Sequence, residues 1–444
     1  MRKHVKYLTV LSMSALMAAM APGMAQSALA ASAGWVEVDG ELRYQDSEGY
    51  YLTDTWKKRN NEWYYLNEDG FLTRSSEVDE YYVDESGKRI TNQWIREDND
   101  EEWDDEAPEA YWHYYGNDGK SVVSKWIEID GNVYYFDEDG HMQTGKLELN
   151  GSTYYLGDEH DGVRKSGWVQ LPNEDEDAEE EMVWHYFDKN GRMVMDQVDR
   201  KIDGAYYTFE NGILQTGWYK LPAAASDEAE TATASNAAPS ISSYQYYEAD
   251  GKRADGWYQM EGAPEISEEG EIFSFHFKKG VPCYAETGVQ LFSIDSKRYA
   301  FNTRGEMQTG LQSVTTEDGT VGNFYFGDDG VMKIGKQTIY NEDLDENQTW
   351  FFTTDGGNKG RGFHGVRDNS VYSQGLRLEA DRDLKYAPVE LDGVTYLVNA
   401  SGALQKASSA SKSSAKPELG KGFKDFTDAE DRIWTVDTNG IVQK

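Results

Sequence analysis

The stretch NVYYFDEDGHMQTG, residues 132–145, contains the pattern that decides the fold. A cluster of aromatic residues is followed by an acidic turn that ends in Gly140, and then by a second short run that ends in Gly145. Aromatic residues favour strands, and Asp-Gly between two such runs is typical of a hairpin turn, because glycine readily adopts the positive φ that the turn needs. The stretch therefore predicts one β-hairpin.

The same pattern recurs from one end of the chain to the other. It reads WYYLNEDG at residues 63–70 and WHYFDKNG at residues 184–191, and Gly119 and Gly140 are 21 residues apart. A period near 20 residues indicates an array in which each short repeat stacks on its neighbours. The predicted fold class is therefore all-β, a solenoid of stacked β-hairpin repeats with very little helix.

Composition supports aromatic hairpins over aliphatic helices. The 444 residues include 30 Tyr, 13 Trp and 16 Phe, yet the mean hydropathy is −0.76. The single cysteine, Cys283, excludes a disulfide framework within the chain.

Residues 1–30 have the plan of a secretory signal peptide. Arg2, Lys3 and Lys6 precede a short apolar stretch and small-residue cleavage sites. No second apolar segment of comparable length follows. We therefore expect an exported protein without a membrane-inserted segment, located in the cell wall or at the cell surface.

The chain is strongly acidic, with a formal net charge of −37. The first 30 residues contain three basic and no acidic side chains, so the charge without them is −40. Such a charge argues against nucleic acid or an anionic membrane as the partner.

The repeats divide by composition into a Trp-rich part, residues 34–280, and a Trp-poor part, residues 281–444. Four polar stretches interrupt them and are expected to form loops. These stretches are residues 97–109, 173–181 and 222–243, and the Lys/Ser/Ala-rich residues 406–421.

Strand alternation separates the aromatic residues of each hairpin onto two faces. We number positions backward from the turn glycine, so that Val133, Tyr134, Tyr135 and Phe136 occupy positions −7 to −4 before Gly140. Positions −6 and −4 stay aromatic or apolar almost throughout, and we expect them to pack the stack. Positions −7 and −5 vary and are the better candidates for ligand contacts.

The full repeat resembles the cell-wall-binding repeat of Gram-positive surface proteins, a family that includes choline-binding modules and glucan-binding repeats. The matching motifs are Gly-Trp, Trp-Tyr-Tyr-Leu, Asp-Gly and Met-x-Thr-Gly. They appear at residues 130–145, 211–218 and 304–310, and variants cover nearly all of the chain beyond residue 34.

The resemblance implies ligand sites between successive hairpins. In choline-binding members, a Gly-Trp ring and hairpin aromatics form an aromatic cage around a quaternary ammonium. Five repeats here retain three rings and are the predicted ligand-binding sites, whereas Val133, Ala205, Arg298 and Asn323 mark predicted spacers. The predicted sites are Trp56, Trp63 and Tyr65; Trp94, Trp112 and Tyr114; Trp168, Trp184 and Tyr186; Trp218, Tyr244 and Tyr246; and Trp257, Phe273 and Phe275.

Motifs for catalysis or cofactor binding are not found. Gly140 and Gly145-Lys146 mimic a phosphate-binding loop but lack the following Ser or Thr. The Asp-x-Asp-Gly turn at residues 137–140 lacks the spacing and the closing Glu of a calcium loop. We therefore expect no catalytic residue, no metal ion and no cofactor, and a protein that is not an enzyme.

Three hypotheses remain open. The preferred one is a secreted, non-catalytic protein that attaches to the bacterial envelope, through choline-type groups on teichoic polymers or through wall glycans. The second is a glucan-binding surface protein that stacks the same rings on sugars. The third is an accessory subunit of a secreted enzyme or toxin, with a secreted partner protein.

Overall fold

A computed structural model describes residues 32–99, 108–158, 160–175, 177–178, 180–222 and 240–444. The predicted signal peptide lies outside the described residues, as do residues 100–107 and 223–239 of the predicted loops. The described chain divides into two compact units. The first holds the described residues up to Gly167 together with Lys189–Arg192, and the second holds Trp168–Asp188 and Met193–Lys444.

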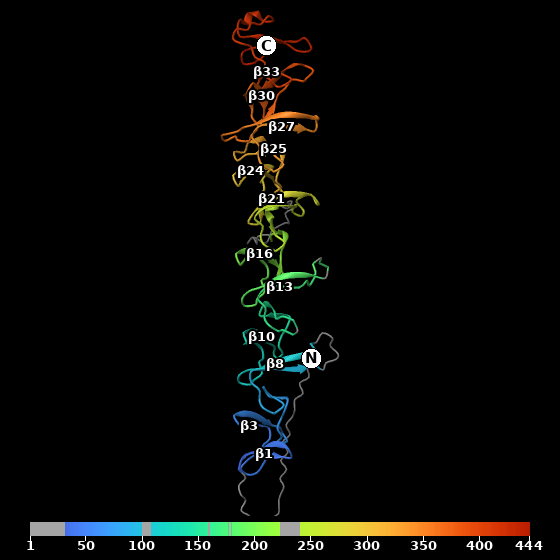
Figure 1. The fold of residues 1–444 in the computed structure, drawn as a ribbon, viewed down its shortest axis with the longest axis vertical. Coiled ribbons are helices and arrows are strands. Elements are labelled where there is room, and N and C mark those ends of the chain that lie inside the picture. The colour runs from blue at the N-terminus through green and yellow to red at the C-terminus, as the bar shows by residue number, and fades with distance from the viewer. Residues whose placement is uncertain (1–31, 100–107, 159, 176, 179, 223–239) are drawn as a thin grey trace, which may run out of the picture. The chain divides into compact units, whose positions relative to one another are not determined.

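The first unit consists of antiparallel hairpins formed by strands adjacent in sequence, and such strands have nearly the same colour in Figure 1. The pairs are β1–β2, β3–β4, β5–β6, β7–β8, β9–β10 and β11–β12. The strands are β1 (Gly34–Val38), β2 (Glu41–Gln45), β3 (Thr55–Arg59), β4 (Glu62–Leu66), β5 (Ser76–Val78), β6 (Tyr81–Val83), β7 (Gln93–Asp98), β8 (Ala110–Tyr115), β9 (Lys125–Ile129), β10 (Asn132–Phe136), β11 (Lys146–Leu149) and β12 (Ser152–Tyr155).

The second unit begins with similar hairpins. Their strands are β13 (Gly167–Pro172), β14 (Met182–Phe187), β15 (Gln197–Ile202), β16 (Ala205–Glu210), β17 (Ile213–Leu214), β18 (Gly217–Lys220), β19 (Tyr244–Tyr247), β20 (Gly256–Glu261), β21 (Ile272–Lys278) and β22 (Val281–Pro282).

The Trp-poor part follows in the same unit. Its strands are β23 (Val289–Ile294), β24 (Lys297–Asn302), β25 (Gly310–Thr315), β26 (Val321–Phe326), β27 (Gly335–Asn341), β28 (Glu346–Phe352), β29 (Gly365–Arg367), β30 (Ser370–Ser373), β31 (Leu376–Arg377), β32 (Tyr386–Leu391), β33 (Val394–Asn399), β34 (Lys424–Thr427) and β35 (Ile433–Val436).

The all-β prediction is confirmed. The helical elements of the described residues are two single 3-10 turns, η1 (Ile241–Ser243) and η2 (Pro417–Leu419). The predicted loop at residues 406–421 contains η2 and lies between β33 and β34.

The acidic residue that opens each turn explains the Asp- or Asn-rich motif. Asp137 Oδ1 accepts hydrogen bonds from the backbone N–H groups of Asp139 and His141, both at 2.9 Å. The N–H of Gly140 donates to the carbonyl of Asp137 at 3.2 Å. Short polar side chains that bond to nearby backbone in this way stabilise turns. The acidic turn is therefore structural.

Neighbouring hairpins stack in one register. The N–H of Met142, two residues after the turn glycine of β9–β10, donates to the carbonyl of Trp112 at position −7 of β7–β8, at 2.8 Å. We call the residue two after the turn glycine position +2. The N–H of Arg89, at position +2 of β5–β6, makes the equivalent bond to Trp63 at 2.8 Å. Position +2 therefore lies against the preceding hairpin.

The turn glycine also packs against the side chain at position +2 of the preceding hairpin. Gly87 has φ +78°, and a Cβ atom there would lie 2.7 Å from the side chain of Leu72 and 2.9 Å from the carbonyl oxygen of Thr73. A φ in this range disfavours any side chain, and the lack of space adds a second constraint. The glycine is thus required by conformation and by packing.

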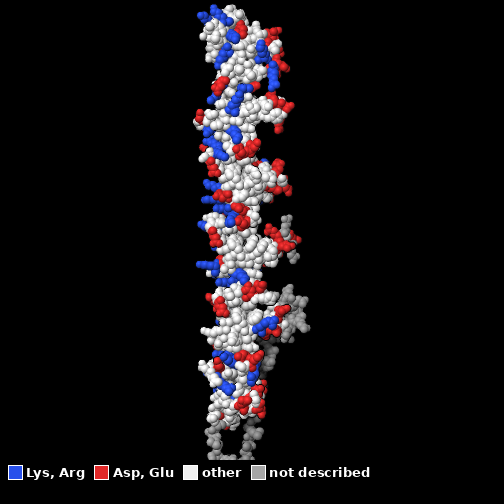
Figure 2. All heavy atoms as spheres, viewed as in Figure 1, with Lys and Arg blue, Asp and Glu red and all other residues white. Residues whose placement is uncertain are grey.

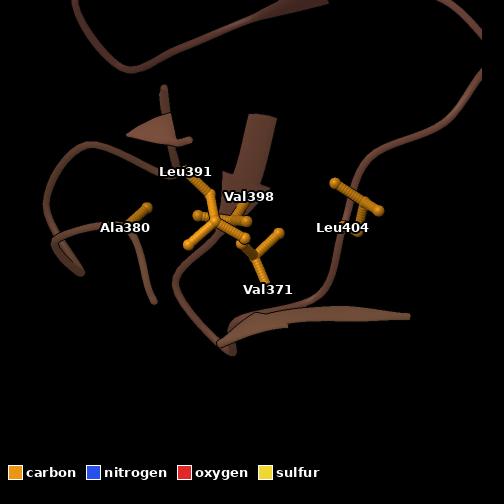
Figure 3. Close-up of a cluster of buried hydrophobic side chains, with 5 residues drawn as sticks. All are labelled: Val371, Ala380, Leu391, Val398 and Leu404. Carbon is orange, nitrogen blue, oxygen red and sulfur yellow. The ribbon is translucent and has the colours of Figure 1, made fainter. Parts of the chain in front are cut away.

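The Trp-poor part joins its hairpins into larger sheets, which the sequence did not predict. Four strands pair in the order β24-β23-β25-β26, and five in the order β27-β28-β31-β30-β29. The buried members of one of its core clusters are all aliphatic. Figure 3 shows this cluster, formed by Val371, Ala380, Leu391, Val398 and Leu404.

Replacement of a stacked glycine is expected to destabilise the protein more than replacement of a glycine at a free hairpin tip. Gly131 has φ +83° but nothing within 4 Å of its virtual Cβ, so Gly131→Ala should cost only the conformational ~1–2 kcal/mol. Gly87→Ala should add roughly 1–3 kcal/mol for overpacking. Thermal unfolding followed by near-ultraviolet circular dichroism measures both variants, and equal losses would contradict the stacking constraint.

Candidate ligand-binding cages

The tryptophan on the first strand of a hairpin builds a cluster of three rings. Trp94 on β7 lies 5.1 Å from Tyr114, its direct cross-strand partner on β8, and 5.0 Å from Tyr134 at position −6 of the next hairpin. The interplanar angles are 60° and 71°. Edge-to-face contacts of this kind contribute about 0.5–1.5 kcal/mol beyond area burial. The indole therefore joins two hairpins.

Seven tryptophans repeat this geometry, with ring centroids separated by 4.7 to 5.7 Å. Each contacts a cross-strand ring in its own hairpin and a ring at position −6, or its structural equivalent, in the next. The clusters are Trp35 with Tyr44 and Tyr64; Trp56 with Tyr65 and Tyr81; Trp94 with Tyr114 and Tyr134; Trp126 with Tyr135 and Tyr154; Trp168 with Tyr186 and Tyr207; Trp218 with Tyr246 and Phe275; and Trp257 with His276 and Tyr299.

Position −6 therefore has a second role that the sequence analysis did not predict. It was expected to pack the stack only, and it also places a ring beside the tryptophan of the preceding hairpin. Position −4 is a packing position as predicted, and Leu66, Phe136 and Phe187 are fully buried there.

One predicted set is not brought together. Phe273 and Phe275 do not surround Trp257, which lies opposite His276 instead. Phe277 pairs with Pro282 around Gly280, whereas Phe136 pairs with Met142 around Gly140, so the turn at Gly280 is one residue shorter. Counting backward from Gly280 therefore assigns every position one residue too early. Phe275 lies 5.3 Å from Trp218, in the preceding cluster.

The groove beside Trp168 is an open cavity of about 660 Å³. Trp168, Trp184, Tyr207 and Leu214 line it. Trp184 is 45% exposed, so its ring faces the groove and solvent. Tyr186, the third predicted member of this set, packs on Trp168 at 5.0 Å and does not line the cavity.

Charged residues surround the same cavity. Glu180, Asp250 and Lys252 contribute to its wall. Lys252 donates to Asp250 at 2.6 Å, and this hydrogen bond lowers the pKa of the Asp250 carboxyl. Burial raises the pKa of the Tyr207 phenol, which therefore stays neutral. The cavity thus combines ring faces with an ionised carboxylate at its edge.

A second cavity, of about 380 Å³, lies beside Trp257. Tyr299 and Met307 form further walls, and Asp328 and Asp329 lie at its margin. A hydrogen bond from Lys333 lowers the pKa of Asp329. This cavity also places carboxylates beside aromatic and apolar walls.

In the other three predicted sets the rings lie near their tryptophan, but the grooves beside them are filled to different extents. Trp112 lies 6.4 Å from Trp94. Tyr244 lies 6.5 Å from Trp218, and Ala263 and Ile266 pack in the same cluster. Trp56 and Trp63 both lie within 6.0 Å of the guanidinium carbon of Arg89. The structure therefore gathers four of the five predicted sets but leaves their grooves unequally open.

Sequence comparisons agree with this arrangement. Residues 123–168 match the choline-binding repeat family, and residues 54–70 and 183–193 match the cell wall binding repeat family. Residues 123–168 therefore carry a choline-binding repeat. The matched segments contain Trp126 and its cross-strand Tyr135, and also Trp56 and Trp184. A comparison with curated protein sequences gives no match.

Solved structures with similarity include three proteins of Streptococcus pneumoniae. The modular autolysin LytC is 20% identical with a TM-score of 0.38, over 62% of this chain and 52% of LytC. Choline binding protein F is 16% identical with a TM-score of 0.26, over 84% and 99%. The choline-binding domain of CbpL is 22% identical with a TM-score of 0.27, over 41% and 97%. The chain thus matches about half the length of LytC.

Other kinds of site were sought in the same part of the chain. No cluster of three or more His, Cys, Asp or Glu side chains among the described residues is arranged to hold a metal ion. Nor do the described residues include a helix with the length and hydropathy that a membrane crossing requires. Figure 2 shows acidic and basic side chains interspersed on the visible face of the described residues.

Removal of the exposed ring of the Trp168 cavity should weaken choline binding there without a large loss of stability. One cation–ring contact contributes about 0.5–2 kcal/mol, so Trp184→Ala should raise the Kd of that site about 2- to 30-fold. Tyr50→Ala removes a ring that is 69% exposed and outside the clusters, and serves as the control. Isothermal titration with choline measures both variants, and an unchanged Kd in Trp184→Ala would show that this ring makes no ligand contact.

Proposed function

We propose that this protein is an exported, non-catalytic protein that attaches to the bacterial cell wall by binding choline-type quaternary ammonium groups of wall polymers. The observation that carries the proposal is the cavity beside Trp168, where Trp184 and Tyr207 complete an aromatic wall and Asp250 lies at the edge.

The chemistry of the cavity suits a quaternary ammonium ion. Such an ion has no N–H to donate, so it gains little from hydrogen-bond acceptors and much from ring faces and carboxylates. The cavity beside Trp257 supports the same ligand, because Asp328 and Asp329 lie with Trp257 and Tyr299. These carboxylates add a Coulomb attraction that only a cationic ligand gains.

Attachment through several cages explains how weak sites can hold a protein on a wall. Each cation–ring contact contributes about 0.5–2 kcal/mol, so one cage alone binds weakly. On a polymer that carries many choline groups, the second and later cages bind intramolecularly, and the overall affinity rises by orders of magnitude.

The export and the absence of catalysis rest on the sequence. Residues 1–30 have the plan of a signal peptide, and no catalytic motif occurs in the repeats. The described residues form hairpins from β1 to β35, and this repetition supports a binding role.

An α-glucan is the second candidate ligand. The observation that favours it is the net charge of −40 without the first 30 residues, because the phosphates of teichoic polymers would repel such a chain. Aromatic faces also stack on sugar rings, so the cavity beside Trp168 is compatible with a glucan.

A resin experiment separates the two ligands. A choline resin is also an anion exchanger, so the acidic protein must be loaded at about 1 M NaCl, where the Debye length is about 3 Å. We expect retention under these conditions and elution by free choline at constant ionic strength. A dextran resin should retain nothing.

The double variant Trp168→Ala with Trp184→Ala should elute earlier from the choline resin, whereas Val133→Ala, at a position without a ring, should elute with the wild type. Retention on dextran alone would assign the cages to glucan. Passage through both resins would exclude both ligands.

A further inference from the structure

Position +2 supplies a side chain to the groove between two hairpins. Its backbone is fixed by the hydrogen bond to position −7 of the preceding hairpin, which for Arg89, Met142 and Arg164 measures 2.8, 2.8 and 2.9 Å. Leu214 and Met307 occupy this position in the two cavities described above. The residue type at position +2 therefore changes what fills the groove.

Arg89 fills the groove beside Trp56. Its guanidinium carbon lies 4.7 Å from the ring centroid of Tyr81, 5.7 Å from that of Trp63 and 6.0 Å from that of Trp56. None of the ion pairs found among the described residues involves Arg89. The stem of Arg89 also packs under Gly119, whose virtual Cβ would lie 3.0 Å from Nε. Three ring faces are therefore the partners of this guanidinium.

The groove beside Trp168 has the same rings but no cation at position +2, and the Lys252 in its wall is paired with Asp250. Trp168, Trp184 and Tyr207 correspond to Trp56, Trp63 and Tyr81, and this groove is an open cavity of about 660 Å³. Position +2 is Leu214 there. Two grooves with matching ring sets thus differ in whether position +2 carries a charge.

A second arginine repeats the arrangement. The guanidinium carbon of Arg164 lies 5.4 Å from the ring centroid of Trp126. Position −7 of this hairpin is Val133, so the groove has one ring fewer than the groove beside Trp56.

Not every arginine at position +2 has this environment. Arg253 lies 4.3 Å from the ring of Tyr206 but also pairs with Asp199 at 2.6 Å. It lies against the preceding hairpin, β15–β16, whose first strand carries no tryptophan. Arg253 therefore serves an ion pair, whereas Arg89 lies among the rings of a cage.

We infer that Arg89 is a built-in ligand, which occupies the cation position of the cage formed by Trp56, Trp63 and Tyr81 and keeps choline out of it. Arg164 takes the same position +2 over the single ring of Trp126. The inference rests on the proposed function, since it assigns which of the choline cages are open. A guanidinium held over ring faces uses the same attraction as a quaternary ammonium.

Competition favours the internal cation. Arg89 is tethered to the cage, and a tethered ligand has an effective concentration on the order of millimolar or above. A single cage binds free choline weakly, so the tethered cation excludes it at low choline concentration. Position +2 then sets the number of binding sites in the array.

The test counts choline sites by isothermal titration of the full chain. Arg89→Met should increase the number of sites by one. Leu214→Arg should decrease it by one, because the new guanidinium reaches the rings beside Trp168. Lys88→Met removes the same charge one residue away, from an exposed pair with Glu62, and should leave the number unchanged.

Failure of the inference and failure of the proposed function give different results. If the wild type binds no choline, the proposed function falls, and the position of Arg89 is still measurable by NMR of the arginine Nε–H groups. Arg89 Hε should be shifted upfield by the ring faces, and choline should not move it. An ordinary shift, or an unchanged number of sites in a folded Arg89→Met variant, would overturn the inference.

Discussion

The contact between the indole of one hairpin and the position −6 ring of the next is the interaction on which the Trp-rich part of this structure depends. It fixes how closely two hairpins approach, as for Trp94 and Tyr134 at 5.0 Å. The same indole forms a wall of the groove between them. Stability and ligand binding therefore share one side chain, which explains why Trp168 belongs both to a core cluster and to a cavity.

Much of this arrangement follows from the sequence, because hairpins are local structures. The turn motif places Gly140, and strand alternation places Tyr135 opposite Trp126. What does not follow is which hairpin supplies the third ring. That depends on how hairpins stack, and no periodicity within one repeat encodes it. Tyr134, at position −6, was therefore assigned to packing alone.

Two further features could not be predicted from the sequence, for physical reasons. The turn at Gly280 is one residue shorter than the common turn, so a count from the glycine misplaced Phe273 and Phe275. Position +2 varies visibly between Arg89, Met142 and Leu214, but its meaning appears only when the preceding hairpin is placed beside it. In a chain with 80 acidic and 43 basic residues, a guanidinium held by rings instead of carboxylates is an informative exception.

Because the hairpins of the first unit pair only strands that are adjacent in sequence, none of these sheets requires residues from a distant part of the chain. Loop closure for such pairs is short, so each hairpin can form early, and its stability then depends on contacts with the neighbouring hairpins. The array can also lengthen or shorten by whole hairpins without a redesigned core. A gene encoding such a protein can therefore change the reach and the valency of its product by duplication or deletion of a segment of about 20 codons.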